Sequence, residues 1–158
     1  TKEQLFERIL DEKVSVMSKE LFPAWGNPDL PFLNRLTMII SAHFDFLVKN
    51  PLLPRFLINE ILSRPERYEL LQSRISQYAG VVFDNLQTEI TKSVEKGEIL
   101  PVDGKMLFIN VMSLNVFTFI AYPLLETAMG DLMADRERFL AIRKAENIEV
   151  IMSRILKR

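Results

Sequence analysis

The longest uncharged stretch of the chain is the twenty-residue segment Met106–Leu125, MLFINVMSLNVFTFIAYPLL, between Lys105 and Glu126. A surface helix normally carries one apolar stripe and one charged face. This segment is apolar nearly all round, so a helix made from it must be covered on more than one side. The cover could be lipid, the middle of a helical domain, or the helix's own domain on one side and a second subunit on the other.

About 20 apolar residues also match the length that spans a bilayer. Polar side chains near the middle of the segment argue against a span, because an unpartnered polar group is costly in hydrocarbon. These side chains are Asn110, Ser113, Asn115 and Thr118, and Pro123 lies near the end. The flanks lack an aromatic belt and a one-sided cluster of positive charge. We therefore expect no membrane span, and a helix covered by its own domain and by a partner.

Helical spacing of apolar residues predicts five further helices around this central one. No segment alternates with period two, so no sheet is expected and the fold class is all-α with six helices. The expected helices are Thr1–Leu21, Pro31–Lys49, Arg55–Leu62, Glu66–Lys96, Gly104–Ala128 and Asp135–Leu156. No repeat or linker divides them, so residues 1–158 are expected to form one domain.

Local signals mark several helix ends. Thr1 and Gln4 have the spacing of a capping box. Gly97 follows the long helix at the position where a left-handed C-cap favours glycine. The N-caps of the second, fifth and sixth helices are expected at Asp29, Asp103 and Asp135.

Composition narrows the function. The chain is 48% hydrophobic and 26% charged with a formal net charge of -1, which is typical of a soluble globular protein. Its lack of cysteine is compatible with the cytoplasm, which is the location expected for it. No overall field attracts nucleic acid or a membrane surface. The absence of cysteine excludes disulfides and thiolate chemistry, and a single histidine argues against a transition-metal site. We see no phosphate loop or nucleophile elbow, and expect no catalytic residue, metal or cofactor.

Aromatic and polar residues on several helices compose a candidate ligand pocket, because pockets are mostly apolar with a few polar groups. The chain has 11 phenylalanines and 7 methionines, and methionine-lined surfaces adapt to varied ligands. The candidates are His43, Phe44, Leu47, Phe56, Tyr78, Phe83, Asn110, Ser113 and Phe117, with Asn115 as a further polar group. The alternative is that the aromatics fill the core and His43 is a hydrogen-bonded core residue.

A heptad-like seam runs along the last helix, where Ala141, Ala145, Ile148, Met152 and Ile155 recur at intervals of four and three. Together with the neighbouring uncharged helix, this seam predicts a homodimer through the last two helices. The expected interface comprises the seam together with Leu114, Ala121 and Leu125 of the central helix.

Two short motifs resemble the regulatory domain of TetR-family transcriptional regulators. The opening Thr1-Lys2-Glu3-Gln4-Leu5-Phe6 resembles the S/T-K-E-x-L-F that follows the helix-turn-helix in that family. The segment KGEILPVD, residues 96–103, is similar to the turn that separates the family's long pocket helix from its first dimer helix. The resemblance covers the whole chain in layout.

The resemblance implies effector sensing and dimerisation. In the family, the last two helices form a four-helix bundle with those of a second subunit. A small hydrophobic or amphiphilic effector moves the first helix, here Thr1–Leu21, and so changes the spacing of two DNA-reading heads. The chain begins inside a helix without a methionine, so we expect DNA contacts only through a head that would precede Thr1. The sequence leaves two other classes of function open, a helical interaction module without a ligand and a helical enzyme.

Overall fold

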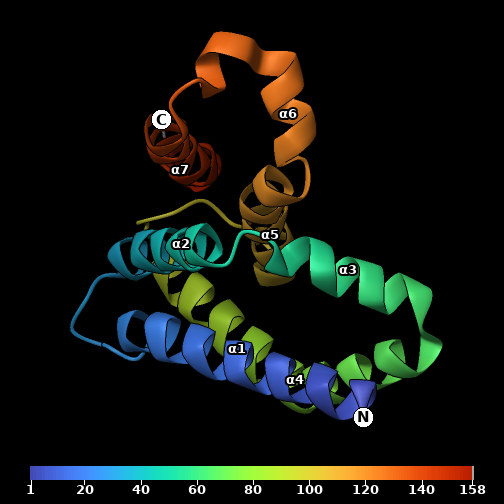
Figure 1. Cartoon of the computed structure of the whole chain (residues 1–158). Helices are drawn as coiled ribbons and strands as arrows, with labels where there is room; N and C mark the ends of the chain where they lie inside the picture. Colours follow the sequence, from blue (N-terminus) through green and yellow to red (C-terminus); the bar gives the residue numbers. More distant parts are fainter. Residues whose placement is uncertain (158) are drawn as a thin grey trace.

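Helices account for all the regular structure in residues 1–157, which the computed structural model describes apart from the side chains of Phe22, Ala24 and Tyr78. The elements are α1 (Lys2–Trp25), α2 (Phe32–Lys49), α3 (Leu53–Ser63), α4 (Pro65–Glu95), α5 (Gly104–Ile120), α6 (Tyr122–Met129), the 3-10 helix η1 (Gly130–Met133) and α7 (Arg136–Ile155) (Figure 1). These residues contain no strand, which confirms the all-α fold class.

The uncharged stretch forms two helices, so the prediction of one helix over Gly104–Ala128 was wrong. The chain bends by 72° where α5 ends at Ile120 and the next helix begins at Tyr122. Pro123 stands in the first turn of α6 and could not donate a backbone hydrogen bond within a continuous helix. The predicted six helices therefore become seven α-helices and one 3-10 helix within the described residues.

No single helix in the described part of the chain is long and apolar enough to cross a membrane. Only the bent pair formed by α5 and residues 122–133 meets the length and composition of a span when taken together.

The turn between α1 and α2 also differs from expectation. Helix α1 continues to Trp25, past the predicted end at Leu21 and through Pro23. A proline near the last turn removes one hydrogen bond. The Trp25 ring meets Phe32 of α2 edge-on, with ring centroids 6.4 Å apart, and this contact favours the longer helix.

Asp29 does not cap α2, contrary to the prediction. The N-cap of α2 is Pro31, and no side chain accepts a hydrogen bond from the first turn. The Asp29 backbone N–H instead donates to Asn27 Oδ1 at 3.1 Å within the preceding turn.

The other predicted caps are confirmed. Thr1 Oγ1 accepts from the Gln4 backbone N–H at 3.3 Å. Asp103 Oδ1 accepts from Met106 at 2.9 Å, and Asp135 Oδ1 accepts from Arg138 at 3.0 Å.

Gly97 ends α4 in a left-handed conformation with φ of 74°. Its N–H donates to the Val94 carbonyl, and the Glu98 N–H donates to the Ser93 carbonyl, both at 2.9 Å. These two bonds form a Schellman motif, in which glycine avoids the steric cost of positive φ. The segment that follows is fixed to the end of α7, because the Leu100 N–H donates to the Ile155 carbonyl at 2.6 Å.

Helices α2, α5 and α7 contact one another pairwise and form the centre of the molecule (Figure 1). Helix α1 packs on α2, α3 packs on α4 and α5, and α6 with η1 arches from α5 back to α7. The core has two apolar clusters. One contains Phe32, Leu36, Ile40, Ile90, Ile99, Leu107, Val111, Ile151 and Ile155. The other contains Phe44, Phe46, Leu47, Phe119, Met133, Phe139 and Leu140.

Candidate functional site

Three buried polar side chains, one from each central helix, form a hydrogen-bonded chain in the core. Asn115 of α5 donates from Nδ2 to the Ile40 carbonyl of α2 at 3.1 Å, and the same nitrogen lies 3.1 Å from His43 Nδ1. Asn147 of α7 donates from Nδ2 to Asn115 Oδ1 at 2.9 Å. Asn115 has no exposed surface and Asn147 has 1%. This network fixes how α2, α5 and α7 are rotated against one another.

His43 is a neutral core residue in this arrangement. Burial lowers the pKa of its imidazole to about 4. Because the two Asn115 amide hydrogens are directed at the Ile40 carbonyl and at Nδ1, Nδ1 is the acceptor and Nε2 carries the proton. The His43 ring lies inside the core, and the residue is 6% exposed. The packing favours the alternative that His43 is a hydrogen-bonded core residue.

The other predicted pocket residues of α2 and those of α3 and α4 are dispersed. Phe44 and Leu47 belong to the second apolar cluster. Phe56 of α3 packs on Phe6 of α1, with ring centroids 6.0 Å apart. Phe83 of α4 meets Phe108 of α5 edge-on at 5.2 Å. The Tyr78 side chain lies outside the described part of the chain.

The predicted pocket residues of α5 lie on its outer face, which consists of Met106, Ile109, Asn110, Ser113 and Phe117. Met106, Ile109 and Phe117 are 54%, 51% and 57% exposed. Asn110 and Ser113 share the exposed face, which is opposite to the face that holds Asn115. The structure therefore does not bring Asn110, Ser113 and Phe117 together with His43.

The predicted seam of α7 is divided between core and surface. Ile155 is completely buried in the first apolar cluster, so it is a core residue and not part of an outer surface. Ile148 and Met152 are half-buried against the same cluster. Ala141 and Ala145 are exposed. On the side of α5, Leu114, Ala121 and Leu125 are half-buried.

A second uncovered apolar strip runs along the middle of α4. We call Leu71, Ile75, Ala79 and Val82 the α4 stripe. Ile75 is 56% and Val82 is 47% exposed. The described side chains from residue 68 to residue 89 include none that is fully buried. Ile61 and Tyr68 join Leu71 and Ile75 in lining a pocket of about 300 Å³ between α3 and α4.

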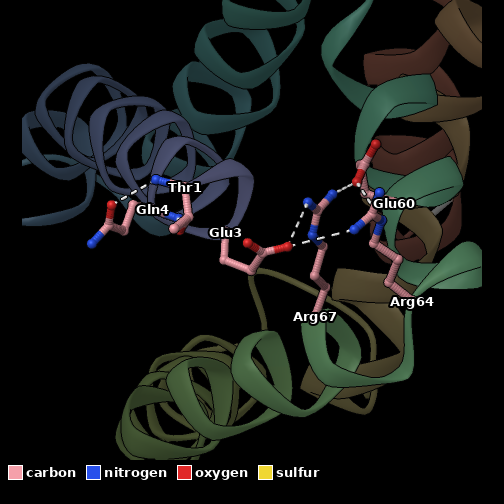
Figure 2. A network of polar contacts seen from close by, with 6 residues as sticks. All are labelled: Thr1, Glu3, Gln4, Glu60, Arg64 and Arg67. Carbon is pink, nitrogen blue, oxygen red and sulfur yellow. Dashed lines mark hydrogen bonds and ion pairs between the residues drawn. The ribbon is translucent and has the colours of Figure 1, made fainter.

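A cluster of charged residues joins the first turn of α1 to the corner between α3 and α4 (Figure 2). The Arg67 side chain is 7% exposed and pairs with Glu60. Its guanidinium lies 4.7 Å from the centroid of the Phe6 ring. Glu3 Oε1 lies 3.9 Å from Arg67 Nη2 and 3.5 Å from Arg64 Nη1.

The same cluster affects the acidity of Glu3. A backbone hydrogen bond holds the pKa of the Glu3 carboxyl below its usual value, and the charges of Arg67 and Arg64 act in the same direction. Sequence reasoning missed this cluster, as it missed Asn147. Charged residues on separate helices give no signal of which of them will pair, because such residues are usually solvated.

In comparisons with known proteins, no family model matches this chain and no curated protein matches it.

Proposed function

We propose that this chain is the effector-sensing and dimerisation domain of a TetR-like transcriptional repressor that acts in the cytoplasm. The observation that carries the proposal is the outer face of α5. Helix α5 has its inner side in the core and exposes Met106, Ile109 and Phe117 on its other side. Large exposed apolar patches mark interaction sites in soluble proteins.

A second copy of the chain is the partner that the proposal assigns to this face. Helices α5 and α7 pack against each other, and in this proposal the exposed sides of both helices meet those of the second copy. Exposed Ala141, Ala145 and Ile142 extend the apolar character onto α7. Two copies related by a two-fold axis would pair these surfaces as a four-helix bundle.

The effector site is proposed at the α4 stripe and not around His43. The apolar residues of the stripe are exposed to water in the free chain, and a bound ligand would bury them. The pocket between α3 and α4 is mostly apolar and can bind a hydrophobic or amphiphilic molecule. Arg67 lies in the first turn of α4 and binds the start of α1 through Glu3. A ligand that displaces α4 would therefore act on α1, the helix that leads to the DNA-reading head in this proposal.

The packed environment of His43 favours a second candidate function, a helical interaction module without a small-molecule ligand. His43 and Asn115 are bound to each other and Asn115 also binds Asn147, so these polar side chains are engaged within the core and do not face a ligand cavity. In that function the outer face of α5 binds a different protein and the α4 stripe has no ligand.

Sedimentation velocity over a range of concentrations tests the proposal. The expected result is a dimer at micromolar concentration, because dimerisation would cover the exposed apolar residues of α5 and α7. A thermal-shift screen of neutral apolar compounds tests the effector site on the same sample. A dimer that no compound stabilises would favour the interaction module, and a monomer at every concentration would remove the TetR-like proposal.

A further inference from the structure

A pocket of about 200 Å³ lies at the bend between α5 and α6, where α3 and α7 also begin. Its apolar walls include Leu52, Phe119, Tyr122 and Pro123. The pocket exists because Pro123 ends α5 and turns the chain by 72°, so that Phe119 and Tyr122 stand on the two sides of the bend. Phe119 is anchored in the core against Phe44, with ring centroids 5.3 Å apart.

Two arginines, Arg55 of α3 and Arg136 of α7, complete the lining. No acidic side chain lines the pocket, and neither arginine forms an ion pair with another residue in the described part of the chain. The Arg136 guanidinium lies 5.8 Å from the centroid of the Tyr122 ring. Asp135 is adjacent in sequence, but its carboxylate caps α7 by accepting from the Arg138 N–H.

The positive charge at this pocket is therefore not balanced by its own lining. The planar guanidinium group matches the geometry of a carboxylate and can bind it with two hydrogen bonds. An apolar pocket with two arginine side chains in its lining is complementary to a molecule with an apolar body and one anionic end.

We propose that this pocket binds a small organic acid. Arg55 and Arg136 hold its carboxylate, and an aromatic or short aliphatic body lies against Leu52, Phe119 and Pro123. The volume is below the range of about 300 to 1,000 Å³ that is usual for drug-sized ligands, so the ligand is smaller than those. The site is separate from the α4 stripe and the outer face of α5, and it does not depend on either.

Benzoate is the test ligand and benzamide is its neutral match, with binding measured by calorimetry and by amide chemical shifts. Benzoate should bind the wild-type chain with a dissociation constant below about 1 mM, and the largest amide shifts should fall at residues 52, 53, 55, 119–122 and 136, which have backbone N–H groups around the pocket. Benzamide should bind at least about tenfold more weakly, because it lacks the charge that strengthens the hydrogen bonds.

Arg55→Gln and Arg136→Gln should each weaken benzoate binding by at least about tenfold. Both side chains are exposed, so the fold should be retained, and circular dichroism checks this. Arg154→Gln, at an exposed position near the other end of α7, should leave binding unchanged.

Three results would overturn the proposal. They are equal binding of benzoate and benzamide, unchanged benzoate binding in both arginine variants, and no saturable binding of benzoate to the folded wild-type chain. The pocket is lined by residues of a single chain, so a monomer and a dimer would bind benzoate alike. A failure of the chain to dimerise in sedimentation would therefore not change the outcome of the benzoate experiment.

Discussion

The side-chain nitrogen of Asn115 lies 3.1 Å from His43 Nδ1, and the two residues join α5 to α2 inside the core. The same nitrogen donates to the Ile40 carbonyl at 3.1 Å, so both of its hydrogens are used. The amide oxygen accepts from Asn147 at 2.9 Å. A single asparagine thus serves three partners on two neighbouring helices, which a hydroxyl or an apolar side chain could not do.

Asn115→Ala should lower the free energy of unfolding by about 3 kcal/mol, because it leaves buried polar partners unsatisfied and opens a small cavity. Urea unfolding monitored by circular dichroism measures the change. Asn110→Ala is the matched control, since it removes the same side chain from the exposed side of α5. It should change stability by less than about 0.5 kcal/mol. Equal effects of the two substitutions would mean that the buried network contributes no stability.

The stability of the fold should depend on pH through His43. Its pKa is about 4 in the folded chain and near the ordinary 6.5 when unfolded, so the unfolded state binds the proton more readily. The contribution of neutral His43 to the free energy of unfolding is complete above pH 6.5 and is lost as the pH falls toward 4. Between pH 7.5 and pH 5 the wild type should lose about 2 kcal/mol from this group.

His43→Gln removes the only imidazole in the chain and provides the comparison for that measurement. Urea unfolding at both pH values gives the loss for each protein. The variant should be less stable at pH 7.5 but should lose about 2 kcal/mol less on acidification. Parallel losses in the two proteins would show that His43 titrates normally and is not held neutral by the core.

The signals that correctly predicted structure were local. Gly97, Asp103 and Asp135 mark helix ends because each satisfies backbone groups within a few residues of itself. The bend at Pro123 was equally local but was missed, because the apolar run continued across it. A proline near the end of an apolar run indicates a break in the helix there, even where the run is long enough for one continuous helix.

The candidate site was harder to predict because α5 has no polar face to show its orientation. Asn110, Ser113 and Asn115 look alike in sequence, yet only Asn115 faces the core. The neighbours decide this, since Ile40, His43 and Asn147 come from helices distant in the chain. Ile155 shows the same limit. Its place in a heptad-like pattern fits a partner helix or its own core equally well.

The charged cluster at the start of α1 gives a further prediction. Glu60→Gln should destabilise the chain by about 2 kcal/mol, since it removes the partner of the nearly buried Arg67 guanidinium. Adding Arg67→Met should recover much of this loss, because the buried charge is then also gone. Thermal unfolding of the single and double variants, with the exposed Glu69→Gln as control, measures both effects. A double variant less stable than Glu60→Gln alone would contradict this account.

The proposed dimer predicts an effect of charge on the outer face of α5. Phe117→Glu should raise the dimer dissociation constant at least about tenfold, because the interface would have to bury an unpaired carboxylate. Phe117 is 57% exposed, so the fold itself should tolerate the change. Sedimentation equilibrium compares it with Leu62→Glu, an 80% exposed position on α3 that should have no effect. Ile148→Glu is less informative, because Ile148 also packs against the core.

The α4 stripe gives the test of effector binding. A neutral amphiphile such as a long-chain alcohol should raise the melting temperature, since it binds only the folded state. At a hundred times its dissociation constant it should raise the free energy of unfolding by about 2.7 kcal/mol. Ile75→Ala and Val82→Ala should reduce this ligand-induced stabilisation. Both side chains are about half exposed, so neither variant should melt much below the wild type without ligand.

Val81→Ala is the matched control for this measurement, because Val81 is adjacent to Val82 but lies off the stripe and is 66% exposed. It should leave the ligand-induced shift unchanged. If the stripe were ordinary core covered by α1 and α3 in solution, Ile75→Ala would instead lower the unliganded stability by about 2 to 5 kcal/mol, as truncations of buried residues do. Differential scanning fluorimetry of the three variants, with and without the alcohol, separates a ligand surface from a packed one. Equal shifts in all three would place the amphiphile elsewhere and remove the stripe as the effector site.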